Sequence, residues 1–181
     1  MTRLISDIDG VVVTSLDPKA DDRGVFTEVH RASWDTRIAP VQWNVVSSRA
    51  DVLRGFHVHI SHADYLLVVD GELLLGLRDI RPESPTHNRT DMLRLNTDAA
   101  AAVTMPPGVA HGFYFSRPSK HLYCVSHYWD RTDELGCRWD DPAIGLNWPT
   151  TSPALSERDR SAGSFEDMVG QFLRGRAAAK A

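Results

Sequence analysis

His57 and His59 stand two residues apart in the segment "LRGFHVHISHADYLLVVDGE" (53–72), and Asp64 follows them before an apolar run. Side chains at positions i and i+2 of a β-strand point to the same face of a sheet. Two imidazoles that face an interior are costly to bury unless each finds a polar partner. The segment therefore predicts a proton-transfer site or a metal site more readily than a purely structural strand.

His111 follows a Pro-Gly turn in "PPGVAHGF" (106–113), where a backbone bend can aim it inward. We group it with His57 and His59 as a candidate functional set. A single histidine in a strand is more often a core or surface residue, and we interpret four others as structural: His62, His87, His121 and His127.

Short apolar runs broken by Gly, Pro, Asp and Asn indicate many strands, as in a sandwich or barrel. Asp70-Gly71 lies between two such runs and predicts a hairpin turn. The last stretch, "SFEDMVGQFLRGRAAAKA" (164–181), has apolar residues at helical spacing, with Ser164 and Asp167 as a start signal. We expect its final residues, "RGRAAAKA", to fray.

The chain has 181 residues, which fits one domain over 1–181 with a core at about 20–160. Its formal net charge is −4 with no basic block, which argues against a nucleic-acid surface. We find no apolar stretch long enough for a membrane span and no signal-type leader. Cys124 and Cys137 have no metal-type spacing, so we expect reduced thiols in a cytoplasmic protein.

Longer motifs recur in a fixed order along the chain. They are "DDRGVFTE" (21–28), "VQWNVVSS" (41–48), "VLRGFH" (52–57), "GLRDIRPESPT" (76–86), "MPPGVAHGFYF" (105–115), "HLYCVSHYW" (121–129), "GCRWDDPAIGLNWP" (136–149) and "LSERD" (155–159). Together they resemble the motifs of the dTDP-4-dehydrorhamnose 3,5-epimerases, a family within the cupin superfamily. The resemblance implies a mostly β, cupin-type jelly-roll barrel with a short C-terminal helical segment.

The resemblance also implies a reaction on a dTDP-linked 4-keto-6-deoxy sugar, at C3, C5 or both, in deoxysugar biosynthesis. His57 would remove the proton next to the ketone, Tyr123 would return a proton on the opposite face, and Asp159 would pair with His57. A weak carbon acid needs such a base and acid on its two faces. No cofactor is required for these steps.

Further residues are expected at the substrate by the same resemblance. Arg23 and Arg54 would hold the diphosphate or the sugar, since guanidinium suits phosphate. The remaining expected contacts are Phe26, Glu28, Gln42, Asn44, His59, Asp64 and His111. Asp79 and His111 would form a supporting polar pair.

Two positions depart from the family pattern. Asp64 stands where the family keeps a lysine that stabilises the negative charge on the ketone oxygen, and His59 stands where it has glutamine. A carboxylate facing an enolate has the wrong sign, because like charges ~4 Å apart repel by about 4 kcal/mol at an effective dielectric of 20.

These departures suggest a second possibility. The pattern H-x-H-x4-D-x6-G, with P-x-G-x-x-H further along, is similar to the metal motifs of the wider cupin superfamily. His57, His59, Asp64 and His111 could then bind a divalent transition metal. His57 cannot be both a ligand and the free base, so the two interpretations compete.

Three hypotheses follow: a metal-independent epimerase, which we favour; a metal-dependent cupin enzyme; and a sugar-nucleotide binding protein without catalysis. We also expect a homodimer, with the segment "TRLISDIDGVVVTS" (2–15) as a possible dimer edge.

Overall fold

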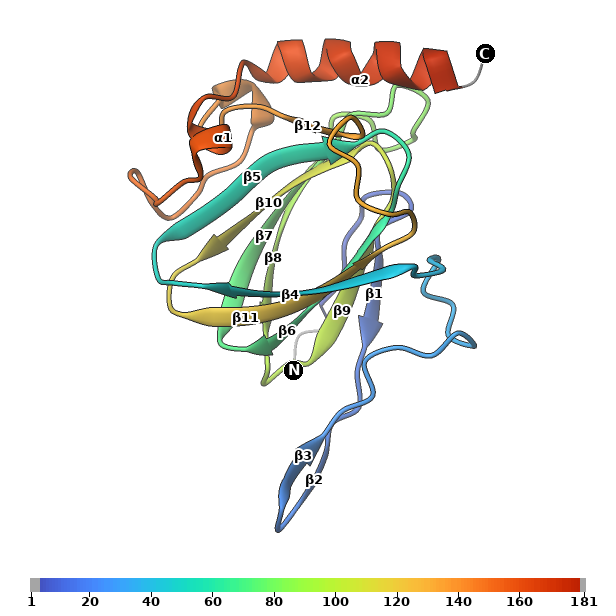
Figure 1. Cartoon of the computed structure of the whole chain (residues 1–181), viewed down its shortest axis with the longest axis vertical. Helices are drawn as coiled ribbons and strands as arrows, with labels where there is room; N and C mark the ends of the chain where they lie inside the picture. The colour runs from blue at the N-terminus through green and yellow to red at the C-terminus, as the bar shows by residue number, and fades with distance from the viewer. Residues whose placement is uncertain (1–3, 180–181) are drawn as a thin grey trace.

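Two five-stranded sheets packed face to face form the body of the protein in a computed structural model, which describes residues 4–179 (Figure 1). The first sheet has the order β1 (Val12–Ser15), β9 (Ala101–Met105), β6 (Asp64–Asp70), β11 (Ser119–Val125) and β4 (Gln42–Ser48). The second has the order β12 (Glu134–Gly136), β5 (Val52–His59), β10 (Val109–Phe115), β7 (Glu72–Asp79) and β8 (Thr90–Asn96). The predicted β barrel of the jelly-roll type is confirmed.

The main core lies between the two sheets, because the strands alternate their side chains across the pleat. Leu66 and Val68 of β6, in the first sheet, share one buried cluster with Leu75 and Leu77 of β7, in the second. The intervening β6 residues, Tyr65 and Leu67, pack on the outer side of the first sheet. Both faces of β6 are therefore covered, and its continuous apolar run is explained.

The predicted turn between β6 and β7 is confirmed. Gly71 has φ +82°, which a glycine adopts without the steric cost of a side chain. A Cβ at this position would lie 2.7 Å from the carbonyl oxygen of Pro118. The turn thus requires glycine both for its backbone conformation and for its close approach to the neighbouring loop.

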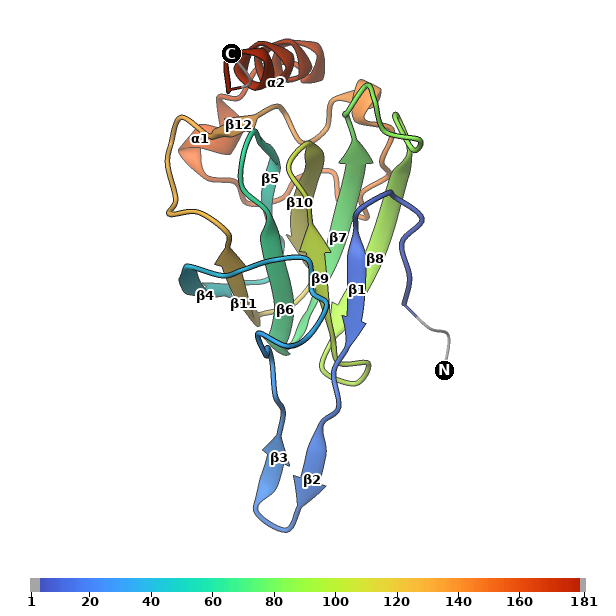
Figure 2. The ribbon, with the colours of Figure 1, turned by 90° about the vertical axis from the view of Figure 1, so that its right-hand side faces the viewer.

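Helix α2 (Phe165–Ala179) lies across one end of the second sheet, next to β12 (Figures 1 and 2). It begins as predicted, since the Ser164 hydroxyl accepts from the Asp167 amide at 3.1 Å. Phe165, Met168 and Phe172 are buried in the cluster beneath it. The expected fraying is wrong for residues 174–179, which remain helical, and Lys180 and Ala181 lie outside the described residues.

Shorter elements flank this layer: α1 (Glu157–Arg160) and the 3-10 helix η1 (Pro142–Ile144). Both cysteines are free and buried, as predicted. None of the helices within residues 4–179 is long and apolar enough to cross a membrane.

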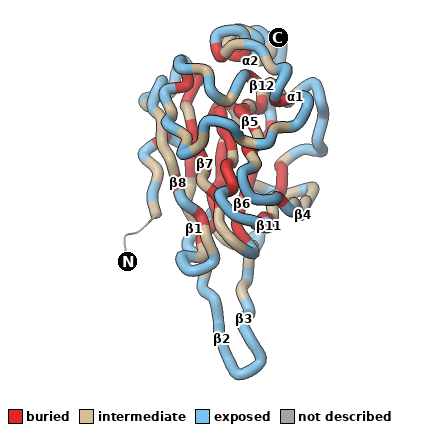
Figure 3. Tube along the Cα trace, turned by 90° about the vertical axis from the view of Figure 1, so that its left-hand side faces the viewer, coloured by how far each residue is buried: buried red, intermediate tan, exposed pale blue. Residues whose placement is uncertain are grey.

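A two-stranded hairpin, β2 (Lys19–Asp21) and β3 (Gly24–Phe26), extends away from the barrel (Figure 1). All six residues of its strands are exposed, and the tube in Figure 3 is pale blue along its length. The segment before it, proposed as a dimer edge, contributes β1 to an edge of the first sheet; its Thr2 and Arg3 lie outside the described residues.

Candidate active site

A pocket of about 500 Å³ opens between the two sheets. His57, His59 and His111 line it from the second sheet, and Asp64 and Tyr123 line it from the first. The predicted common face of His57 and His59 is thereby confirmed. The barrel brings together residues that are far apart in the sequence and surrounds them with strands on both sides.

Strands β5 and β10 approach closely beside this pocket. A Cβ on Gly55 would lie 2.8 Å from the Cα of Gly112, so glycine is needed at the crossing. The pairing register places His57 directly opposite His111. The glycines of "LRGFH" and "AHGF" thus allow the two histidine-bearing strands to lie side by side.

His57 is held from both ring nitrogens by carboxylates. Its Nε2 lies 2.7 Å from Oδ1 of Asp159, and its Nδ1 lies 3.3 Å from Oε1 of Glu134. Asp159 reaches His57 from α1, whose N-cap Ser156 accepts from the Asp159 amide at 3.1 Å. The structure therefore brings His57 and Asp159 together, as the resemblance implies.

The Asp159 carboxyl is buried, which alone would favour its neutral form. The hydrogen bond and charge of His57 outweigh this burial and hold the pKa of Asp159 below its usual range. An ionised Asp159 accepts a hydrogen bond from the imidazole and fixes the orientation of its ring.

Glu134 was missed by the sequence reasoning. It comes from β12, which pairs with β5, and it also binds Trp129 Nε1 at 2.6 Å and Arg158 at 2.7 Å. Burial raises the pKa of Glu134, but His57, Trp129 and Arg158 outweigh it and lower the pKa. Glu134 reaches the site because β12 pairs with β5, and we find no local sequence motif that marks it.

Tyr123 lies on β11, half-buried in the pocket wall opposite the histidine strands. Burial raises the pKa of Tyr123, and the charges of Asp64 and Glu134 add to this effect. The phenol is therefore protonated at neutral pH and available to donate a proton.

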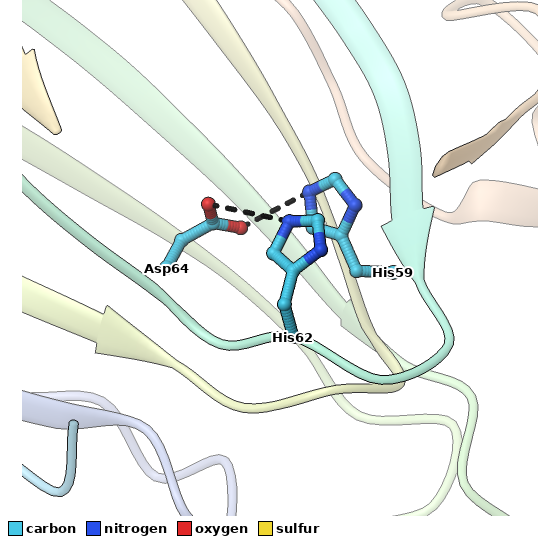
Figure 4. A group of neighbouring side chains, drawn as sticks. All are labelled: His59, His62 and Asp64. Atoms are coloured by element: carbon cyan, nitrogen blue, oxygen red, sulfur yellow. Dashed lines mark ion pairs between the residues drawn. The ribbon is translucent and has the colours of Figure 1, made fainter. Parts of the chain in front are cut away.

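Three histidines surround Asp64, and Figure 4 shows two of them, His59 and His62. Its carboxylate lies 3.1 Å from His59 Nε2, 3.6 Å from His111 Nε2 and 3.8 Å from His62 Nε2. Burial raises the pKa of Asp64, but the neighbouring His59 chiefly offsets this and the pKa is lowered. Asp64 thus carries a charge, and three imidazoles face it.

The histidine set differs from the expected one. His62, which we interpreted as structural, is buried and belongs to the cluster of His59 and Asp64, whereas His57 is held by Asp159. His62 is oriented by Asp133, which lies 2.5 Å from its Nδ1. Burial lowers the pKa of His62, but Asp133 and Asp64 outweigh it and raise the pKa. The sequence signal that could have identified His62 as a site residue was its position three residues after His59.

The expected pairing of Asp79 with His111 is wrong. The Asp79 carboxylate accepts hydrogen bonds from three groups of its own loop: Arg81, Ser84 and Thr86. His111 instead places Nδ1 3.1 Å from the carbonyl oxygen of Val109. Burial, which outweighs the opposing charge of Asp64, lowers the pKa of His111 to about 4.

The predicted substrate contacts divide into two groups. Arg54 lines the pocket and donates to Ser48 at 3.1 Å. Gln42 and Asn44 share the face of β4 with pocket residues but do not line the pocket; they hydrogen-bond to each other at 3.0 Å. Two arginines that we did not predict, Arg49 and Arg158, also line the pocket.

The N-terminal group lies outside the pocket within one chain. Arg23 pairs with Asp21 on the projecting hairpin, and Phe26 is 66% exposed there. Glu28 pairs with Arg31 just after the hairpin. In this arrangement the hairpin does not reach the pocket that contains His57 of the same chain.

Comparison with known proteins identifies the family. The profile described as dTDP-4-dehydrorhamnose 3,5-epimerase matches residues 6–167. The dTDP-4-dehydrorhamnose 3,5-epimerase of Pseudomonas aeruginosa is 35% identical over 156 residues, covering 81% of this chain and 86% of its own. The spore coat polysaccharide biosynthesis protein SpsL of Bacillus subtilis is 33% identical over 149 residues, covering 79% and 97%.

A solved structure agrees with the sequence matches. The epimerase RmlC of Legionella pneumophila, in complex with dTDP-4-keto-L-rhamnose, superposes with a TM-score of 0.85 at 26% identity, covering 93% of this chain and 95% of its own. The matches extend over nearly the whole barrel and include the strands that carry the pocket. This chain therefore belongs to the dTDP-4-dehydrorhamnose 3,5-epimerase family of isomerases.

Proposed function

We propose that this protein epimerises a dTDP-linked 4-keto-6-deoxy sugar at C3, C5 or both, using His57 as the base and Tyr123 as the acid. The observation that carries the proposal is the hydrogen bond of 2.7 Å between His57 and buried Asp159, on one side of a pocket that Tyr123 enters from the other sheet. The substrate class comes from the family and from the dTDP-4-keto-L-rhamnose of the Legionella complex.

The base chemistry follows from the way His57 is held. Asp159 fixes Nε2, so Nδ1 is the nitrogen that takes the proton from the carbon next to the ketone. Glu134 lies 3.3 Å from this nitrogen. The substrate carbon and the Glu134 carboxylate therefore compete for one position, and Glu134 moves when the sugar binds.

The acid chemistry follows from the state of Tyr123. Proton loss gives an enolate with its charge on the C4 oxygen, and Tyr123 then donates its phenolic proton to the opposite face of the same carbon. The buried phenol has a raised pKa, so it carries this proton at neutral pH. Solvent afterwards returns a proton to Tyr123 and takes the one that His57 received, and the configuration at the carbon is inverted.

The diphosphate is expected at the arginines of the pocket wall. Arg54 and Arg49 line the pocket, and their guanidinium groups can each donate two hydrogen bonds to a phosphate. Arg158 is occupied by Glu134. We therefore assign the diphosphate to Arg54 and Arg49 and leave Arg158 to position Glu134.

The active assembly is proposed to be a homodimer. The hairpin exposes Val25 and Phe26, at 68% and 66%, and β4 exposes Trp43 and Val45, at 42% and 68%. A hairpin that projects from the barrel with two exposed apolar side chains is suited to contact a second copy, where Arg23 and Phe26 would reach the partner's substrate. Light scattering should report a dimer that Phe26→Asp dissociates and Leu173→Asp, on exposed α2, leaves intact.

The experiment that tests the function compares wild type with His57→Asn on dTDP-4-keto-6-deoxyglucose. We expect wild type to form the epimer and His57→Asn to lose at least 100-fold in kcat, the lower range for a general base. Affinity for dTDP should remain within a few-fold, because His57 does not bind the nucleotide. Full activity of His57→Asn, or equal loss of dTDP binding, would contradict the assigned role.

A further inference from the structure

The Nε2 atoms of three histidines converge on one buried carboxylate. His59 and His111 lie 3.1 and 3.6 Å from Oδ2 of Asp64, and His62 lies 3.8 Å from Oδ1. His59 and His62 are drawn with Asp64 in Figure 4, where both rings turn a nitrogen toward the carboxylate. Contacts of 3.6 and 3.8 Å are too long for hydrogen bonds. The four side chains therefore face one another without bonding fully.

Two of these rings are oriented by a contact at Nδ1, the nitrogen that faces away from Asp64. His62 Nδ1 lies 2.5 Å from a carboxylate oxygen of Asp133, and His111 Nδ1 lies 3.1 Å from the carbonyl oxygen of Val109. Both outer atoms are acceptors, so each Nδ1 carries the hydrogen and each Nε2 can present a lone pair. A carboxylate or carbonyl behind the ring is the usual arrangement for a histidine that binds a metal.

Two polar atoms of the cluster have no hydrogen-bond partner. They are Nδ1 of His59 and Oδ2 of Asp64, on residues that are only 7% and 5% exposed. An unsatisfied buried polar atom costs about 1–3 kcal/mol. A bound cation, which accepts electron pairs, would offset this cost for Asp64. A purely structural role for Asp64 does not explain why the cost is tolerated.

The spacing suits donors that share one ion. With metal–ligand bonds of ~2.0–2.1 Å, two donors lie about 3.4 Å apart at a tetrahedral angle and about 2.9 Å apart at a right angle. The three separations around Asp64 are 3.1, 3.6 and 3.8 Å. The ligand atoms of His59, His62 and Asp64 all lie within 4.8 Å of one another. Side-chain movement on binding would bring these donors, and His111 beside Asp64, to the separations that one ion requires.

We propose that His59, His62, Asp64 and His111 bind one divalent transition-metal ion, such as Zn²⁺, Ni²⁺, Co²⁺, Mn²⁺ or Fe²⁺. Imidazole and carboxylate donors suit these ions. Imidazole binds only in its neutral form, so binding releases any proton that His62 carries on Nε2. The site lines the same pocket as His57, where an ion would supply a Lewis acid for a ketone oxygen.

The assignment removes the competition for His57. That residue is held by Asp159 at 2.7 Å and faces Glu134 at 3.3 Å, so it stays outside the ligand set. In the proposed set of metal ligands, His62 replaces His57, which the sequence pattern alone had suggested. Metal binding by this set does not depend on the epimerase reaction, and the two proposals can fail separately.

The test is calorimetric titration of tag-free, chelator-treated protein with each chloride salt, supported by elemental analysis of the protein as purified. We expect about one equivalent of at least one ion to bind. The Co²⁺ form should show the visible absorption of a four- or five-coordinate site. His59→Gln and Asp64→Asn should each weaken binding at least 10-fold, and Asp133→Asn, which only orients His62, about 10- to 100-fold.

His87→Gln is the matched control, because His87 is an exposed histidine outside the pocket. Thermal unfolding in metal-free buffer shows whether each variant is folded. If a variant of a metal ligand does not fold, Asp133→Asn replaces it in the binding comparison. Added metal should raise the unfolding temperature of wild type and His87→Gln, but not of Asp64→Asn. The proposal is overturned if none of the five ions binds stoichiometrically, or if the pocket variants and His87→Gln bind alike.

Discussion

Replacing Asp159 with asparagine removes one charge from the pair that orients His57 and leaves its shape nearly unchanged. The carboxylate lies 2.7 Å from His57 Nε2 and is only 6% exposed. A hydrogen bond to a charged group contributes about 1.5–3 kcal/mol. At ~1.36 kcal/mol for each factor of ten, its loss in the transition state lowers kcat about 10- to 150-fold.

The assay follows epimer formation by NMR over a range of substrate concentrations, so that kcat and KM are obtained separately. The loss should fall on kcat, because the charge of Asp159 acts on the proton transfer and does not touch the nucleotide. Glu157→Gln is the control: it removes an exposed carboxylate from the same short helix. Unfolding temperatures and dTDP affinities of both variants should stay close to those of wild type.

Three outcomes would refute this reasoning. The Asp159→Asn enzyme could keep kcat within twofold of wild type, it could lose only affinity for substrate, or Glu157→Gln could lose as much. Each would show that Asp159 serves the fold of the loop and not the proton transfer at His57. The loss should also be smaller than that of His57→Asn, since the base itself remains.

Three further changes follow from the same contacts. Tyr123→Phe should still exchange substrate hydrogen with solvent through His57, while epimer formation falls at least 100-fold; equal loss of both by NMR would contradict its role as the acid. Burial raises the pKa of Asp79, but hydrogen bonds, first from Arg81, outweigh it and lower the pKa from 3.8 to about 2, which corresponds to about 2 kcal/mol of folding free energy. Because this pKa is depressed on folding, the contribution is complete above about pH 4 and is lost as pH falls toward 2. In urea titrations Asp79→Asn should be less stable than wild type at pH 7, and its free energy of unfolding should fall less between pH 4 and pH 2. A fall equal to that of wild type would count against the network. Gly71→Ala should lower stability by about 1–3 kcal/mol, since φ +82° and the carbonyl of Pro118 oppose a Cβ; an unfolding temperature within a degree of wild type would contradict this.

The parts of the fold that the sequence predicted depend on neighbours in the chain. The spacing of His57 and His59 determines that they share a face, Asp70-Gly71 closes its own hairpin, and Ser164 caps the helix that follows it. Each of these features requires only a few consecutive residues. The ordered motifs then allowed the barrel itself to be identified by resemblance.

The parts that could not be predicted depend on long-range pairing. Glu134 reaches His57 because β12 pairs with β5, and Asp133 reaches His62 in the same way. Asp79 binds Arg81, Ser84 and Thr86 of its own loop, and His111 instead contacts the carbonyl oxygen of Val109. Competing local partners of this kind are visible only once the backbone is placed.

The position of the hairpin is a second such case. The motif "DDRGVFTE" resembles the family pattern closely, yet Arg23 and Phe26 lie far from the pocket of their own chain. A motif transfers residue types but does not say which copy of the chain they serve. The homodimer proposed above is the arrangement that would use them.

The measurement that tests the central claim most directly is solvent deuterium exchange into dTDP-4-keto-6-deoxyglucose, followed by NMR with purified wild-type protein in D2O. We predict deuterium at C3, at C5 or at both, well above the uncatalysed rate, because His57 removes the proton next to the ketone. The carbons that exchange also show whether Asp64, at the family's lysine position, narrows the reaction. Exchange no faster than in the absence of protein would contradict the epimerase assignment for this substrate.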